Sequence, residues 1–214
     1  MIKKLNIFVA TIMFTFFTSL NAEIQYGFSL ITGQTDISGS ETEGTAADTS
    51  VRTKSIKEVF VGGDIFVESV ADGGVTYGIS LVPLDIEIGN GSRTDTSAGA
   101  DIASEADTGT RTASADLSNL ITLYANVPMG TSGWYALLGG HYTTVSTKES
   151  LNESSYGDED IYGIQVGLGL RGGNLKYELS YSDFEDISIS SSGGGTNSIS
   201  ADADALAFRI SYGF

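Results

Sequence analysis

The sequence predicts an all-β protein, an eight-stranded antiparallel up-and-down transmembrane β-barrel. Three observations lead to this fold class. Segments with an apolar residue at every second position recur along the chain, which is the period of a β-strand with one apolar face. The connections between these segments alternate between long polar stretches and short turns. The chain also finishes on such a segment, ALAFRISYGF, although chain ends are usually polar and frayed.

The first 22 residues have the composition of a secretory signal peptide. Lys3 and Lys4 precede an apolar stretch of about 16 residues, and Ala22 supplies a small residue at the cleavage site. This stretch is shorter than the roughly 20 apolar residues of a membrane-spanning helix. We therefore expect a signal peptide at residues 1–22 and a barrel domain at residues 23–214. Cleavage removes two lysines and no acidic residue, so the formal net charge changes from −16 to −18.

The composition excludes several classes of protein. The chain has no cysteine, so it forms no disulfide and no thiolate metal site. With 27 acidic and 11 basic residues, it lacks the cationic surface that nucleic-acid binding requires. No second apolar stretch is long enough for a membrane-spanning helix. A glycine-rich, proline-poor chain of this length favours one all-β domain.

The first four predicted strands alternate apolar and polar residues. They are IQYGFSLIT from Ile24, KEVFVGGDIFVE from Lys57, VTYGISLVPLDIEI from Val75 and DLSNLITLYANV from Asp116. In the second strand, Val59 and Val61 lie on the apolar face, while Glu58 lies on the opposite one. The alternation of the third strand shifts at Val82-Pro83, which predicts a β-bulge, a position that tolerates proline.

The last four predicted strands have the same period. They are WYALLGGHYTTV from Trp134, IYGIQVGLGLR from Ile161, LKYELSYSDF from Leu175 and ALAFRISYGF from Ala205. The apolar face of the final strand continues to Phe214, so something must cover it up to the last residue. The segment GLGLRG, residues 167–172, fits a dinucleotide-binding pattern. It lies inside a predicted strand and opens no helix, so we predict no nucleotide site there.

The seven connections between these strands alternate in length. Short turns are predicted at residues 71–74, 128–133 and 172–174, and long polar stretches at residues 33–54, 89–115, 146–160 and 187–200. Bacterial outer-membrane barrels have this asymmetry, with short periplasmic turns, long extracellular loops and an even number of strands.

Aromatic residues gather near the short-turn ends of the strands, which predicts an aromatic girdle at one membrane boundary. Its predicted members are Tyr26, Tyr77, Tyr124, Trp134, Tyr177, Tyr212 and Phe214. Tyr142, Tyr162 and Tyr181 lie closer to the long-loop end.

The final strand resembles that of small eight-stranded bacterial outer-membrane β-barrel proteins, such as the membrane domain of outer-membrane protein A and the opacity-type barrels. The resemblance is carried by Phe208, Ile210, Tyr212 and Phe214. It implies that these residues form the terminal strand read by the outer-membrane assembly machinery. It also implies location in the bacterial cell outer membrane, with membrane lipid and lipopolysaccharide as partners. The physical reason for closure is independent, because every backbone polar group within lipid must be paired.

The inward faces of the predicted strands are polar. The predicted charge network of the lumen comprises Glu58, Asp64, Glu68, Arg171, Lys176, Glu178 and Arg209. Side chains can just fill the interior of an eight-stranded barrel, and buried charges must be paired. The network therefore forms either a plug of ion pairs or a polar path for small solutes or ions.

Three functions are compatible with these features. The first is a structural or surface-interaction role in the cell envelope, without catalysis. The second is a narrow porin-like channel for small or apolar solutes, and the third is a lipid-modifying outer-membrane enzyme. The only histidine, His141, is expected to face the lumen without a local triad motif. We therefore predict no catalytic residue, cofactor or metal site, while an external partner stays open.

Overall fold

The computed structural model describes residues 23–45, 48–71, 73–95, 109–150, 156–190 and 198–214. The strands are β1 (Glu23–Thr45), β2 (Asp48–Val70), β3 (Thr76–Leu81), β4 (Ile86–Asp95), β5 (Gly109–Pro128), β6 (Trp134–Glu149), β7 (Glu159–Gly172), β8 (Leu175–Phe184), β9 (Ile187–Ser190) and β10 (Ser198–Gly213). No helix in the described ranges is long and apolar enough to cross a membrane. The predicted signal peptide lies outside the described residues.

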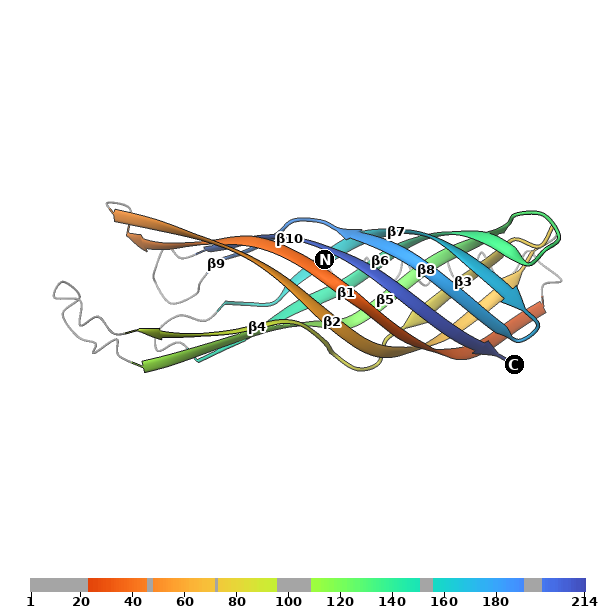
Figure 1. Cartoon of the computed structure of the whole chain (residues 1–214), viewed down its shortest axis with the longest axis horizontal. Coiled ribbons are helices and arrows are strands. Elements are labelled where there is room, and N and C mark those ends of the chain that lie inside the picture. The colour runs from red at the N-terminus through yellow and green to blue at the C-terminus, as the bar shows by residue number, and fades with distance from the viewer. Residues whose placement is uncertain (1–22, 46–47, 72, 96–108, 151–155, 191–197) are drawn as a thin grey trace, which may run out of the picture.

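Eight strands close into a ring in the order β1-β2-β3-β5-β6-β7-β8-β10, and β10 pairs back onto β1. Every neighbouring pair in this ring is antiparallel. The closing ladder runs from Gly27 opposite Gly213 to Thr42 opposite Ser198. Figure 1 shows the strands running obliquely along a long barrel, with the C-terminus at one end. The predicted eight-stranded antiparallel barrel is confirmed.

Three tight turns lie at the end of the barrel where the chain finishes, which we call the short-turn end (Figure 1). They join β2 to β3, β5 to β6 and β7 to β8. Gly73, Gly130 and Gly173 have positive φ angles of 88°, 84° and 63° in these turns, a region that favours glycine. The predicted short connections are therefore in the expected places.

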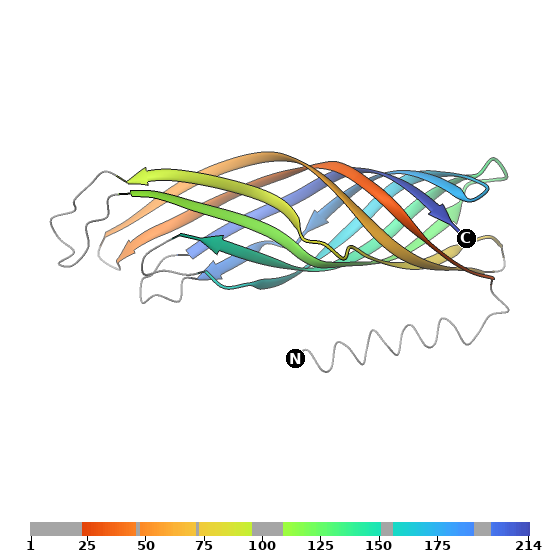
Figure 2. The same ribbon diagram turned by 90° about the horizontal axis from the view of Figure 1, so that it is seen from below.

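The long polar stretches contain far more strand than we predicted. Strands β1 and β2 continue to Thr45 and from Asp48, and β4 and β5 continue to Asp95 and from Gly109. The hairpins β1–β2 and β4–β5 consequently extend beyond the rest of the barrel (Figures 1 and 2). Serine and threonine tolerate the extended backbone, and sparse inward apolar residues still alternate along these segments. The prediction of loops over these segments was wrong.

The predicted third strand is broken, not merely bulged. Pairing between β2 and β3 stops at Ile65 opposite Leu81, and residues 82–85 form no ladder with β2. Beyond the break, β4 pairs only with β5. We call the boundary between β2 and β4, over residues 54–63 and 86–91, the β2–β4 seam. Side chains of β2 and β4 pack against each other here without a backbone ladder. In the described residues β9 likewise pairs only with β10 and forms no ladder with β7.

An apolar band surrounds the outside of the barrel near the short-turn end. Leu30, Val166, Leu179 and Phe208 are among its members, and each is 40–66% exposed. Tyr26, Tyr77, Trp134, Tyr177, Tyr212 and Phe214 are exposed as predicted for a girdle, and Tyr162 and Tyr181 are exposed at the other margin of the band.

Tyr124 does not belong to the predicted girdle. It is 6% exposed and lies inside the lumen, so its assignment to the girdle was wrong. The physical reason is strand parity, because Leu123 and Val127 occupy the outward positions of β5 and are exposed.

We call the strand segments beyond the apolar band the crown (residues 33–45, 48–58, 86–95, 109–118, 143–149, 159–160, 185–190 and 198–205). Its outward face is polar. Asp36 of β1 lies directly opposite Asp204 of β10, and Asp204 lies opposite Asp183 of β8, just outside the crown. Lys148 donates a hydrogen bond of 2.7 Å to Asp116, and this carboxylate raises the pKa of Lys148 above its ordinary value.

The interior toward the crown is apolar, which corrects our expectation that all inward faces are polar. The buried cluster contains Ile31, Val82, Ile86, Ile88, Leu117, Val145, Tyr156, Ile161, Ile187, Ile189 and Ala203. Tyr156 lies in this cluster and its hydroxyl donates a hydrogen bond of 3.0 Å to Glu41. The wall thus changes character along its length. Near the short turns the outer face of the wall is apolar and the inner face is polar. In the crown the outer face is polar and the inner face is apolar.

Candidate functional site

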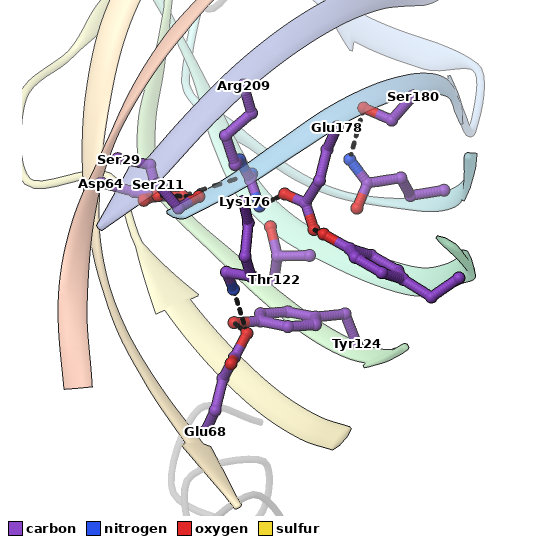
Figure 3. A network of polar contacts seen from close by, with 12 residues as sticks. Ser29, Asp64, Glu68, Thr122, Tyr124, Lys176, Glu178, Ser180, Arg209 and Ser211 are labelled. Atoms are coloured by element: carbon purple, nitrogen blue, oxygen red, sulfur yellow. Dashed lines mark hydrogen bonds and ion pairs between the residues drawn. The ribbon is translucent and has the colours of Figure 1, made fainter. Parts of the chain in front are cut away.

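Strand β2 places Glu68 at the centre of the polar half of the lumen, where its side chain is fully buried. Arg171 Nη2 lies 2.8 Å from Glu68 Oε2, and Lys176 donates a hydrogen bond to Oε1. The Tyr124 hydroxyl also donates to Oε1, over 2.8 Å. Figure 3 shows Lys176 and Tyr124 converging on this carboxylate from different strands. One carboxylate therefore pairs with two cations in the lumen.

A second group of charges forms around Arg209 of β10. Its Nη2 lies 3.2 Å from Asp64 Oδ2, and its Nη1 lies 3.6 Å from Glu178 Oε2. Both distances are within the range of an ion pair, but neither Asp64 Oδ2 nor Glu178 Oε2 accepts a hydrogen bond. The Tyr135 hydroxyl donates a hydrogen bond of 2.8 Å to Glu178 Oε1. Arg209 thus lies between two carboxylates, as Figure 3 shows.

We call Asp64, Glu68, Arg171, Lys176, Glu178 and Arg209 the lumen network. It holds three acidic and three basic residues, so its formal charges balance. Arg171 is the most accessible, with its side chain 27% exposed, and the other five side chains are at most 11% exposed. Buried charges are tolerated when each has a partner of opposite sign. The arrangement is a closed set of ion pairs across the lumen.

Glycines make room for the two tyrosines of the lumen. A Cβ on Gly78 would lie 2.3 Å from Cζ of Tyr124, and a Cβ on Gly169 would lie 2.1 Å from Cζ of Tyr135. Only residues without a side chain fit at these positions. The glycines thereby allow the tyrosine rings to reach across the lumen to Glu68 and Glu178.

The structure brings together six of the seven predicted lumen charges and leaves one apart. Glu58 is half-buried on the crown side of β2, and it makes no ion pair with the described residues. Sequence reasoning missed Tyr124, Tyr135 and Phe66, over whose ring Lys176 Nζ lies at 4.2 Å. The parity of β5 was a usable signal for Tyr124, since Thr122 and Tyr124 alternate with apolar neighbours.

A layer of neutral polar residues lies between the lumen network and the apolar interior. His141 faces the lumen as predicted, with Nδ1 2.8 Å from Thr122 Oγ1 and Nε2 2.9 Å from Ser182 Oγ. The His141 ring also stacks on Phe184 at a centroid distance of 5.4 Å. No carboxylate orients the imidazole through these bonds, and Ser182 is buried. This arrangement lacks the acidic third member and the access that a Ser-His hydrolase needs.

The terminal strand places Phe208, Ile210, Tyr212 and Phe214 on the outside, each 38–60% exposed. The Phe214 N–H donates a hydrogen bond of 2.8 Å to the Tyr26 carbonyl oxygen. Its ring lies 5.9 Å from that of Tyr26, 6.1 Å from Phe28 and 5.3 Å from Tyr212. Aromatic contacts therefore reinforce the closing ladder between β1 and β10 at its last position.

Deletion of Phe214 should strongly impair assembly in cells but only slightly lower the stability of the refolded protein in vitro. We expect little mature protein in the membrane fraction, because the resemblance assigns the terminal aromatic to recognition by the assembly machinery. The refolded protein should lose only about 0.5–1.5 kcal/mol, the order of one aromatic pair contact. Gel mobility of unheated samples measures folded barrel in both settings. Normal membrane levels of the deletion variant would contradict the assignment.

Three solved structures are similar in fold to this chain. OprG from Pseudomonas aeruginosa is 12% identical, with a TM-score of 0.49 and coverage of 89% of this chain and 95% of its own. Ail of Yersinia pestis is 11% identical, with a TM-score of 0.42 and coverage of 90% and 99%. AlkL is 10% identical, with a TM-score of 0.44 and coverage of 88% and 90%. No family model and no curated protein matches the chain. The fold assignment therefore rests on the ladder of the chain itself, which closes eight antiparallel strands into one barrel.

Proposed function

We propose that this chain is an integral protein of the bacterial outer membrane with a structural or surface-interaction role and no open channel. The observation that carries the proposal is the apolar band around a closed ring of strands. A closed ring leaves no unpaired edge in lipid at the level of the band, and exposed side chains such as Leu30 and Val166 match hydrocarbon. The short-turn end then faces the periplasm and the crown faces outward.

Two layers inside the barrel argue against conduction. The lumen network crosses the lumen from β2 to β7 and β8 through Glu68, and Arg209 links β10 to β2 and β8. Above it, the apolar cluster of the crown interior is packed around residues such as Leu117, Val145 and Ile161, each at most 8% exposed. An ion would have to break buried ion pairs and then enter an apolar interior. The channel hypothesis is therefore less well supported than the structural or surface-interaction role.

The crown supports a surface role. It extends the barrel wall beyond the apolar band as two long hairpins (Figure 1). Their outer faces carry hydroxyl and charged side chains, such as those of Ser55, Asp36 and Lys57. Its apolar interior holds these hairpins as a structured platform, as the core of a water-soluble β-protein would. An enzymatic role has weaker support, because the His141–Ser182 pair is buried and lacks a carboxylate partner.

The refolded protein should insert into vesicles without producing a stable conductance. We expect it to float with phosphatidylcholine vesicles in a density gradient and to resist extraction by carbonate. In planar bilayers it should give no lasting current steps, because the lumen network and the apolar interior leave no continuous water column. Failure to float would refute the membrane location. Large, stable current steps would instead establish a channel.

A further inference from the structure

Two breaks in the ring divide the crown into two sheets. The first break, at residues 82–85, separates β3 from β4, and the second, at residues 185–186, separates β8 from β9. Beyond these breaks, in the described ranges, β4 pairs only with β5 and β9 pairs only with β10. One sheet of the crown therefore has the order β2-β1-β10-β9, and the other has the order β4-β5-β6-β7. We call the crown part of the second sheet the flap (residues 86–95, 109–118, 143–149 and 159–160).

The two sides of the flap lack a backbone ladder to the other sheet over the residues that the structure describes. At the β2–β4 seam the contacts are between side chains, and a Cβ on Gly89 would lie 3.8 Å from Ile56 Cδ1. At the boundary between β7 and β9, the Ser188 N–H donates a hydrogen bond of 2.7 Å to Glu159 Oε2. Because backbone ladders join the strands within each sheet, these two boundaries are where the wall separates most easily.

The base of the flap coincides with a line of irregular geometry, which we call the crease. At the first break, the Val82 N–H donates a hydrogen bond of 2.9 Å to the Leu120 carbonyl oxygen. The next residue, Asn119, has a positive φ of 56°, and the register between β5 and β6 shifts at the same place. At the second break, the Glu185 N–H donates a bond of 2.9 Å to the Tyr162 carbonyl oxygen. The register of β5, β6 and β7 connects these points, and because bulges bend a strand locally, the crease has the geometry of a hinge.

Tyr156 ties the tip of the flap to the opposite sheet. It lies in the connection between β6 and β7 and packs inside the buried apolar cluster. Its hydroxyl donates a hydrogen bond of 3.0 Å to Glu41 of β1, and its carbonyl oxygen accepts one of 3.2 Å from Thr147 of the flap. Tyr156 therefore connects the two sheets across the interior of the crown.

The closed position of the flap buries its apolar inner face. Leu117 and Val145 of the flap are 8% and 2% exposed. They belong to the same cluster as Ile187, Ile189 and Ala203 of the other sheet. Exposure of these side chains to water is unfavourable, so the closed position is the more stable one. Side-chain packing and a few hydrogen bonds maintain it, whereas the ring below the crease is closed by ladders.

We propose that the flap is a hinged lid that moves away from the β2-β1-β10-β9 sheet about the crease, with the Tyr156–Glu41 hydrogen bond as its latch. The ladders within the flap stay intact during this movement, so the flap opens as one body. Opening exposes the apolar inner face of the crown to the outside, while the ring below the crease stays closed. This inference goes beyond the proposed surface role and does not depend on it.

The test measures how fast buried cysteines react in the full-length protein refolded in detergent micelles. The chain has no cysteine of its own, so Val145→Cys places a single reporter on the inner face of the flap. Leu137→Cys is the matched control, because Leu137 is on the same strand, is 1% exposed and lies below the crease. A polar maleimide should label Val145→Cys faster than Leu137→Cys. Adding Tyr156→Phe should raise the rate at Val145→Cys about fivefold, the equivalent of about 1 kcal/mol for one hydrogen bond, and leave Leu137→Cys unchanged.

Tyr135→Phe is the control for the latch, because it removes a similar hydrogen bond, to Glu178, below the crease. It should not change the labelling of Val145→Cys. If Val145→Cys does not fold, Leu117→Cys on β5 serves as the reporter with the same expected result.

Three results would overturn the lid. The first is equal labelling of Val145→Cys and Leu137→Cys, and the second is a labelling rate at Val145→Cys that does not respond to Tyr156→Phe. The third concerns hydrogen exchange of the amides in the β4–β5 ladder. Tyr156→Phe should leave this exchange unchanged, since the ladder moves with the flap. Faster exchange there would mean that the strands fray one by one instead of moving as a body.

Discussion

Replacing Glu68 with alanine should destabilise the folded barrel by about 3–5 kcal/mol, the largest loss we expect from any single substitution. The carboxylate is fully buried and accepts hydrogen bonds from Arg171, Lys176 and Tyr124. Its removal leaves two cations inside the lumen without their acid. Urea unfolding in phosphatidylcholine vesicles, followed by the fluorescence of Trp134, the only tryptophan, measures the loss.

Glu58→Ala is the control for this substitution. Glu58 lies on the same strand, but it is only half-buried and makes no ion pair with the described residues, so its loss should be small. The double variant Glu68→Ala/Lys176→Ala should be less destabilised than the sum of its single variants, because fewer charges remain unpaired. Equal effects of Glu68→Ala and Glu58→Ala, or strictly additive losses in the double variant, would contradict the network.

Arginine in place of Val166 should cost about 2–4 kcal/mol, the penalty for a cation at the bilayer midplane of a barrel. Val166 is 48% exposed and lies on β7 between Tyr162 at one margin of the apolar band and Leu170, the register partner of Trp134, at the other. The same urea titration in vesicles gives the stability, and the yield of folded barrel gives a second readout.

Ser55→Arg provides the matched control for the membrane face. Ser55 is exposed on the crown portion of β2, and its residue parity is that of Val59 and Val61. An arginine there stays in water, so folding and stability should match those of wild type. If Val166→Arg and Ser55→Arg were equally stable, the apolar band would not face hydrocarbon, and the proposed membrane location would be wrong.

The barrel could be predicted from the sequence because apolar and polar residues alternate regularly along its strands. Alternation located all eight strands of the ring, and turn glycines such as Gly73 and Gly173 located the tight connections. The polar crown strands were missed because their apolar residues are sparse. Ile37 and Ile56, for example, lie among serine, threonine and charged neighbours that resemble a loop locally. Pairing with a long partner strand overrides that local signal, since ladder bonds satisfy the backbone.

The lumen network was predictable in its members but not in its connections. Parity placed Asp64, Glu68 and Arg209 inside, but which acid meets which base depends on the stagger between strands. Glu58 was included because it shares that parity, although it lies on the crown side of the network. The break after Leu81 was only partly foreseen, because Pro83 signals an interruption but says nothing of its length. Contacts between side chains on distant strands therefore could not be predicted from the sequence pattern.

In the proposed membrane location, the reversal of the wall from apolar-outside to polar-outside would set the depth of the barrel and produce a hydrophobic mismatch. Sinking the barrel would carry Asp36, Asp183 and Asp204 into hydrocarbon, and raising it would expose the aromatic margin at Tyr26 and Phe214. Along β7 the band spans about 26 Å of strand, or about 20 Å of height at the usual tilt. A membrane thicker than this cannot be matched by vertical movement. In the proposed location the lipids next to the barrel would thin to match it, which is one of the ways a bilayer accommodates a short hydrophobic span.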